Sequence, residues 1–112
     1  MTLFEKIVAR EIPAKIVHEE DDLLAFADIA PQAPVHILIV PKQVIPRIGE
    51  ATAQQAPLLG RMLIAAGKIA REMGIDESGF RIVINHGNEG GETVPHLHMH
   101  LLGGRQMTWP PG

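Results

Sequence analysis

The stretch His96-Leu97-His98-Met99-His100-Leu101-Leu102 alternates imidazole and apolar side chains. A β-strand has a side-chain period of two, so it would place all three imidazoles on one face and Leu97, Met99 and Leu101 on the other. A helix would rotate successive histidines by about 200° and would leave neither a common site nor an apolar face. The stretch therefore predicts a half-buried strand that carries a cluster of histidines.

Four other segments have the composition of strands. Val35 to Val40 is a β-branched apolar run bounded by prolines, which is typical of a central strand buried on both faces. Ala14 to Glu19 and Leu23 to Ile29 flank an acidic tetrad, as two strands joined by an exposed turn would. Phe80 to Asn85 alternates as well, and the histidine strand is expected to extend over Val94 to Leu102.

Two segments have helical periodicity. Apolar residues recur at helical spacing from Leu3 to Val8, and Pro13 stops the pattern. Apolar residues also recur at intervals of three and four from Thr52 to Met73, where Thr52 and Gln55 match a capping box and Gly74 ends the pattern. The sequence predicts a short first helix and a long second one.

A second side of the long helix carries Gly60, Ile64 and Gly67. Glycine costs up to about 1 kcal/mol inside a helix unless something needs to approach closely. We therefore expect a second packed surface on this side of the helix.

The length and charge of the chain narrow the classes of protein it can belong to. Its 112 residues predict a single domain over residues 1–112 with one compact core. A net charge of -3 disfavours binding to a DNA or RNA duplex, and no run approaches the roughly 18 to 20 apolar residues that cross a bilayer. The chain has no cysteine and its N-terminus lacks a secretory pattern, which together favour the cytoplasm.

The histidines could serve metal binding or nucleophilic catalysis. In a strand the backbones of His96 and His100 would lie roughly 13 Å apart, at about 3.3 Å per residue, whereas a zinc to nitrogen bond is about 2 Å long. One ion could hardly hold all three rings, so we predict no metal site and no cofactor. Neutral imidazole can instead attack phosphorus, and His98 is the natural nucleophile because it has a histidine on either side.

The segment before the histidines fits phosphate chemistry. Gly87 to Thr93 is rich in glycine, which lets main-chain N–H groups approach an anion closely, and Thr93 adds a hydroxyl donor. Three other polar residues are ambiguous by themselves. His36 fits a hydrogen-bonded core histidine, while Asn85 and Asp28 fit turn residues at strand ends.

The chain resembles the histidine triad superfamily, whose signature of three alternating histidines and two apolar residues matches His96 to Leu102. The likeness to the Hint branch extends over Ile12 to Ile16, Asp28 to His36, the Gly-Gly-x-Thr-Val loop and the ending Leu102 to Gly112. This resemblance implies an α+β protomer with a five-stranded antiparallel sheet and two helices. It also implies a homodimer with a continuous ten-stranded sheet.

The resemblance further implies a hydrolase that cleaves the P–N bond of purine nucleoside 5'-phosphoramidates, and also acyl-nucleotides, through a nucleotidyl-histidine. His98 would be the nucleophile, with His36, His96 and His100 completing the catalytic set. The nucleotide-binding residues that it implies are Asp28 and Ile29 at the ribose, Leu3, Phe4, Ile7 and Phe26 at the base, Asn85, Gly91 and Thr93 at the phosphate, and Trp109 near the partner's pocket.

The chain departs from the animal Hint pattern at three positions: Thr93 replaces serine, Pro95 replaces tyrosine and Glu92 replaces glutamine. The charge of Glu92 beside an anion site would weaken substrate binding unless the side chain points to solvent. Two alternative functions stay open. One is a dinucleoside polyphosphate hydrolase, which usually has glutamine at the position of Thr93. The other is a non-catalytic protein that binds nucleotides or zinc.

Overall fold

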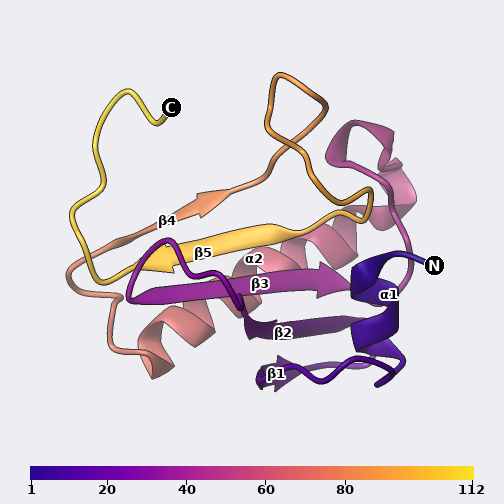
Figure 1. The fold of residues 1–112 in the computed structure, drawn as a ribbon, viewed down its shortest axis with the longest axis horizontal. Coiled ribbons are helices and arrows are strands. Elements are labelled where there is room, and N and C mark those ends of the chain that lie inside the picture. The colour runs from indigo at the N-terminus through magenta and orange to yellow at the C-terminus, as the bar shows by residue number, and fades with distance from the viewer.

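The structure is a computed structural model that describes residues 1–112, and its centre is one antiparallel sheet (Figure 1). The strand order is β1-β2-β3-β5-β4, so β3 lies in the middle, as the apolar run of that segment predicts. The strands are β1 (Ile16–Glu19), β2 (Leu23–Ala27), β3 (Val35–Pro41), β4 (Phe80–Val83) and β5 (Met99–Gly103).

Two helices complete an α+β fold, which confirms the expected architecture of the protomer. The helix α1 (Leu3–Val8) begins with a capping box between Thr2 and Glu5, and α2 (Ala56–Glu72) is the long helix. Figure 1 shows α2 crossing behind the sheet and α1 in front of one end of it. Each face of the sheet is therefore covered by one helix.

The start of the second helix differs from the prediction. The capping box of Thr52 and Gln55 is present, but it caps a 3-10 turn at Ala53–Gln55, and the α-helix begins only at Ala56. Pro57 accounts for the difference, because proline lacks an N–H and is accommodated in the first turn of an α-helix. A second short 3-10 helix covers Ile48–Glu50.

The sheet divides the apolar core into two parts. The larger part packs α2 against one face of the sheet and contains Leu97, Met99 and Leu101, as the alternation in their segment predicts. The smaller part lies under α1 on the other face and includes Phe4, Phe26 and four aliphatic residues. The histidines therefore face α1, where the smaller core leaves room for a site.

The strand of the histidine segment is shorter than predicted, because β5 begins at Met99 rather than at Val94. Pro95 cannot donate to a sheet ladder, and the N–H of Leu97 donates instead to the oxygen of Ile45 in the loop after β3. The inward and outward alternation nevertheless continues through residues 96–98, since Leu97 lies in the larger core. Residues 96–98 are therefore held in place by the loop after β3 and not by pairing within the sheet.

No helix of this fold has the length and apolar character needed to cross a membrane. The outer side of α2 is bare: Ile64 is 76% exposed, and no atom lies within 4 Å of a side chain built at Gly60. The second packed surface expected there has no partner within the chain.

Candidate active site

Two of the four predicted catalytic histidines lie on neighbouring strands. His36 is on β3 and His100 is on β5, and the register pairs Leu38 with His100, so the two imidazoles are diagonal neighbours on one face of the sheet. Their facing nitrogens, Nε2 of His36 and Nδ1 of His100, are 2.9 Å apart. The strand register thus brings together residues 64 positions apart in the sequence.

His96 is fully buried and holds its segment in place from both ring nitrogens. Its Nε2 lies 2.7 Å from the main-chain oxygen of Pro41 at the end of β3, and its Nδ1 lies 3.0 Å from the hydroxyl of Thr2. Thr2 is also the N-cap of α1. His96 therefore connects α1 to the loop after β3 and serves the site as a support.

His98 occupies the centre of the histidine row. Its ring meets the edge of Phe4 at 4.8 Å and the ring of His100 at 5.0 Å between centroids. Its Nδ1 lies 2.7 Å from the main-chain oxygen of His96, which can only accept a hydrogen bond. His98 therefore donates from Nδ1, and in the neutral ring Nε2 carries an unprotonated lone pair.

The same reasoning assigns the other rings. The N–H of Gln32 donates to Nδ1 of His36, so Nε2 of His36 carries the proton and donates to Nδ1 of His100. The remaining nitrogen of His100, Nε2, is then an N–H donor without a partner in the protein. At the pocket, His98 thus offers a lone pair and His100 offers a proton donor.

Burial keeps three of the four rings neutral. It is the main cause that lowers the pKa of His36 and of His96 below the ordinary histidine value, against the opposing pull of Asp28 and of the Pro41 carbonyl respectively. The pKa of His100 falls to about 4, first through burial and then through repulsion by charge on His98 and His36. These three imidazoles are uncharged at neutral pH, so the hydrogen-bond assignment above holds there.

A cavity of about 230 Å³ opens in front of His98 and His100, between α1 and the sheet. Its wall is mainly apolar, and the predicted base-pocket residues all belong to it. Asp28 stands at one side of the cavity with a carboxylate oxygen 3.4 Å from Nε2 of His36. The predicted residues that line this cavity are Leu3, Phe4, Ile7, Phe26, Asp28, Ile29, Thr93, His98 and His100.

Three predicted nucleotide-binding residues do not line this cavity. Asn85 donates from its side chain to the oxygen of Gly90 at 2.7 Å, and Gly91, which has a positive φ of 76°, belongs to the same loop. Trp109 is 82% exposed on the C-terminal tail. Within one chain, Asn85 and Gly91 shape the glycine-rich loop, and Trp109 does not line the cavity.

Three main-chain donors of the glycine-rich loop are already bonded within the loop. The N–H of Gly87 donates to the carboxylate of Glu92 at 3.0 Å, and the N–H groups of Gly91 and Glu92 donate to carbonyls of the same loop. The N–H groups of Asn88, Glu89 and Gly90 make no hydrogen bond, and further free donors follow the loop. The hydroxyl of Thr93 and the main-chain N–H of His98 make no hydrogen bond within the protein.

The negative charge of Glu92 is compensated by a positive side chain. Glu92 therefore does not stand beside the phosphate site as a free anion. Nε and Nη2 of Arg47 lie 2.9 and 3.0 Å from the two carboxylate oxygens of Glu92, which is a bidentate pair. This bonding, followed by the Gly87 N–H, holds the pKa of Glu92 down to about 2. The two residues clamp the loop to the segment before α2.

Thr2, Gln32 and Arg47, which orient groups of this site, were not predicted from the sequence, and neither were five residues of the cavity wall: Ile12, Pro13, Ala14, Leu38 and Val94. Thr2 could have been found, because Thr2 and Glu5 have the spacing of a capping box. Gln32 acts through its main chain, and Arg47 meets Glu92 only through tertiary folding, so no local pattern marks either residue.

One group of residues has the donor types of a metal site. Ligand atoms of Asp28, His36 and His100 lie within 4.8 Å of one another. To bind zinc, Nε2 of His36 would have to lose its proton, which would move to Nδ1 and oppose the Gln32 N–H that now donates there. The hydrogen-bonded arrangement of these rings therefore does not fit a zinc ion.

Comparisons with known proteins identify the family to which this fold and this row of histidines belong. A sequence profile of the HIT domain matches residues 9–107, so this chain belongs to the HIT domain family.

Individual relatives resemble the chain over nearly its whole length. A HIT-like protein of Synechococcus elongatus is 59% identical over 111 residues, which cover 99% of this chain and 96% of the relative. The 14 kDa zinc-binding protein of Brassica juncea is 50% identical over 113 residues, covering 99% of each. The crystal structure of a HIT family hydrolase from Legionella pneumophila superposes with a TM-score of 0.98 at 51% identity, covering 100% of both chains.

Proposed function

We propose that this protein is a nucleotide-binding hydrolase that cleaves the P–N bond of purine nucleoside 5'-phosphoramidates, and also acyl-nucleotides, to release the nucleoside monophosphate. The observation that carries the proposal is the 2.7 Å bond from Nδ1 of His98 to the oxygen of His96. This bond leaves the Nε2 lone pair of a neutral imidazole free at the cavity, where it can act as a nucleophile. The similarity to a HIT family hydrolase supports the reaction class.

The cavity suits a nucleoside monophosphate. Its apolar wall, made by residues of α1 and β2, can hold a flat heterocycle, while Asp28 offers a carboxylate to ribose hydroxyls and Ile29 lies beside it. The Thr93 hydroxyl and the His98 N–H are free donors for the phosphoryl oxygens. Asn85 and Gly91 support this end of the site by fixing the loop before Thr93.

The reaction would proceed in two displacements. Nε2 of His98 attacks the α-phosphorus, a P–N bond to His98 forms and the P–N bond to the leaving amine breaks. The departing nitrogen takes up one proton and is stabilised by the Nε2–H of His100. Water then attacks phosphorus, the bond to His98 breaks, and the proton that water releases balances the one taken up by the amine. His36 and His96 hold the two reacting rings in these tautomers.

The active form is proposed to be a homodimer of a single HIT domain in the cytoplasm. The edge strand β4 is the next strand after α2 in the chain, and both elements expose apolar side chains. Phe80 on β4 is 38% exposed and Ile64 on α2 is 76% exposed. A second copy joined along β4 would extend the sheet to ten strands. Trp109, exposed on the tail beyond β5, would then be free to reach the partner's pocket and influence the leaving group.

One assay tests the activity. The protein is incubated with adenosine 5'-phosphoramidate and with a diadenosine polyphosphate, each with and without a chelator, and compared with His98→Ala. We expect AMP release from the phosphoramidate that is insensitive to the chelator and reduced in the variant by a factor on the order of 10⁴ or more. Preference for the dinucleotide would favour a polyphosphate hydrolase. Loss of activity with chelator, or no turnover at all, would contradict the proposal.

A further inference from the structure

The C-terminal tail touches the loop that supports His36. Gly104 has a φ of 89°, and a side chain built on it would approach Pro34 within 2.9 Å, so only glycine fits this close contact. The next residue, Arg105, donates from Nε to the main-chain oxygen of Gln32 at 3.0 Å and from Nη1 to the oxygen of Gln106 at 3.3 Å. The tail is thereby fastened to the loop between β2 and β3.

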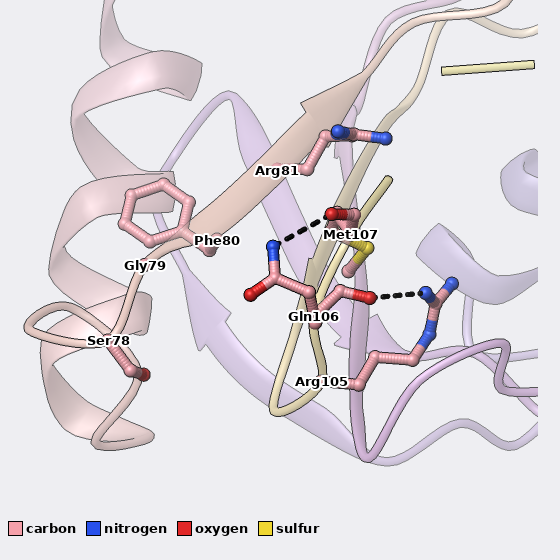
Figure 2. A pocket seen from close by; sticks show the side chains of 7 residues that line it. All are labelled: Ser78, Gly79, Phe80, Arg81, Arg105, Gln106 and Met107. Carbon is pink, nitrogen blue, oxygen red and sulfur yellow. Dashed lines mark hydrogen bonds between the residues drawn. The ribbon is translucent and has the colours of Figure 1, made fainter. Parts of the chain in front are cut away.

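Arg105 is a cation without an acidic partner. It forms no salt bridge, and it lines a cavity of about 220 Å³ between the start of β4 and the tail. Figure 2 shows Arg105 and Arg81 on either side of the Gln106–Met107 segment. Arg81 also donates to a tail carbonyl, that of Thr108 at 2.8 Å, but it makes no hydrogen bond to Gln32. The contact to Gln32 is specific to Arg105.

Gln32 faces the active site from its other side. Its N–H donates to Nδ1 of His36 at 3.0 Å, so the two hydrogen bonds of the Gln32 main chain bracket its α-carbon. The loop around it has no regular secondary structure and contains Pro31 and Pro34, which donate no hydrogen bond. Within the loop, the Ala30 N–H donates to the Asp28 carboxylate and the Gln32 side chain donates to the oxygen of Ala30. From the tail, Gly104 packs against Pro34, and Arg105 supplies the one hydrogen bond to the Gln32 main chain.

The orientation of this N–H sets the protons of two imidazoles. As long as Nδ1 of His36 accepts from Gln32, Nε2 of His36 must donate to Nδ1 of His100, and Nε2 of His100 must carry a proton toward the cavity. A rotated Gln32 would leave His36 free to adopt the other tautomer. His100 would then lose the hydrogen bond from His36 that fixes its own tautomer.

We propose that Arg105 is a positioning residue for the histidine pair: by holding the carbonyl of Gln32 it keeps the Gln32 N–H on His36 and so maintains the donor at Nε2 of His100. The kinetic consequence rests on the hydrolase function proposed above, whereas the effect on the rings does not. Docking of the tail and the protonation pattern of the active site are coupled through one main-chain segment.

The test measures the ring tautomers directly. Nitrogen-15 chemical shifts of His36 and His100 are recorded near neutral pH in the wild type, in Arg105→Met, which keeps the aliphatic stem without donors, and in Arg105→Lys, which restores one donor. Arg81→Met is the matched control, because it removes the other guanidinium bound to the tail. We expect Nε2–H on both rings in the wild type and in Arg81→Met, mixed tautomers in Arg105→Met, and partial recovery in Arg105→Lys.

Kinetics form the second readout. Arg105→Met should lower kcat for adenosine 5'-phosphoramidate roughly three- to tenfold, the effect of about one hydrogen bond, and leave KM unchanged. Wild-type tautomers in Arg105→Met, or the same change in Arg81→Met, would overturn the proposal. If Arg105→Met does not fold, Arg105→Leu, which also lacks a donor, takes its place, and wild-type shifts or an unchanged kcat in that variant would overturn the proposal equally. A wild type that shows these tautomers but no turnover would refute the hydrolase function alone.

Discussion

Nε2 of His36 and Nδ1 of His100 lie 2.9 Å apart and join β3 to β5 on the side of the sheet that faces α1. Protonating His100 would break this bond from the acceptor side and would place a cation in a half-buried position. The pKa of His100 is accordingly lowered from 6.5 to about 4.

The stability of the protein should therefore depend on pH. Since the unfolded chain binds more protons than the folded one between pH 6.5 and about 4, the contribution of His100 is complete above pH 6.5 and is lost as the pH falls through this window. Its size is on the order of 3 kcal/mol. Urea denaturation at several pH values should show this decline, and His100→Gln should flatten it. An equal slope in wild type and variant would refute the assignment.

The clamp between Arg47 and Glu92 should control substrate affinity more than turnover. Arg47→Gln removes the main cause of the lowered pKa of Glu92 and leaves its carboxylate, still ionised at neutral pH, as an uncompensated anion beside the phosphate end of the cavity. We expect KM to rise roughly tenfold while kcat stays within about twofold. The double variant with Glu92→Gln removes both charges and should recover most of the affinity. Steady-state kinetics measure KM for each variant. A double variant whose KM is as high as that of Arg47→Gln would show that the charge of Glu92 does not cause the loss of affinity.

Much of this fold could be predicted from patterns of period two and period three to four. The alternation from His96 to Leu102 correctly placed the leucines and Met99 in the core under α2, and the prolines around Val35 to Val40 marked the central strand. The true start of β5 could not be predicted, because it depends on the bond between Leu97 and Ile45 across the fold.

The site was predictable where a side chain acts by its own chemistry. The alternation of the histidines pointed to His98, and the resemblance to the histidine triad superfamily implied the apolar wall. The tautomers depend on main-chain groups of Gln32 and His96 that any residue could supply. The role of Glu92 was misjudged because its partner, Arg47, lies 45 positions away in the sequence. Local patterns mark reactive groups but not the distant groups that orient them.

Ile29 offers a way to test the cavity without damaging the core. It lines the cavity yet is 94% exposed, so Ile29→Ala should change the free energy of unfolding by less than about 0.5 kcal/mol. Loss of its contact with the nucleoside should raise KM roughly threefold to tenfold. Val44→Ala, at a 42% exposed apolar residue outside the cavity, should leave KM unchanged. Equal KM values for both variants would place the nucleoside elsewhere.

The bare side of α2 should hold a second copy of the chain. Ile64→Glu places a charge in the middle of this exposed apolar surface and should convert a dimer into a monomer in sedimentation velocity, with the circular dichroism spectrum unchanged. Val44→Glu, which adds the same charge at a 42% exposed apolar residue outside α2, reports the effect of an added negative charge by itself. A monomeric wild type, or a variant that remains a dimer, would rule out this interface.

The central claim is that Nε2 of His98 forms a covalent bond to the α-phosphorus of a nucleotide. The most direct measurement mixes the protein with adenosine 5'-phosphoramidate, quenches the reaction in alkali within the first turnover and determines the intact mass and the modified peptide. We predict an increase of one adenylyl group on the peptide that contains His98, absent in His98→Asn. Release of AMP with no adduct at any time, or an adduct on another residue, would contradict this account.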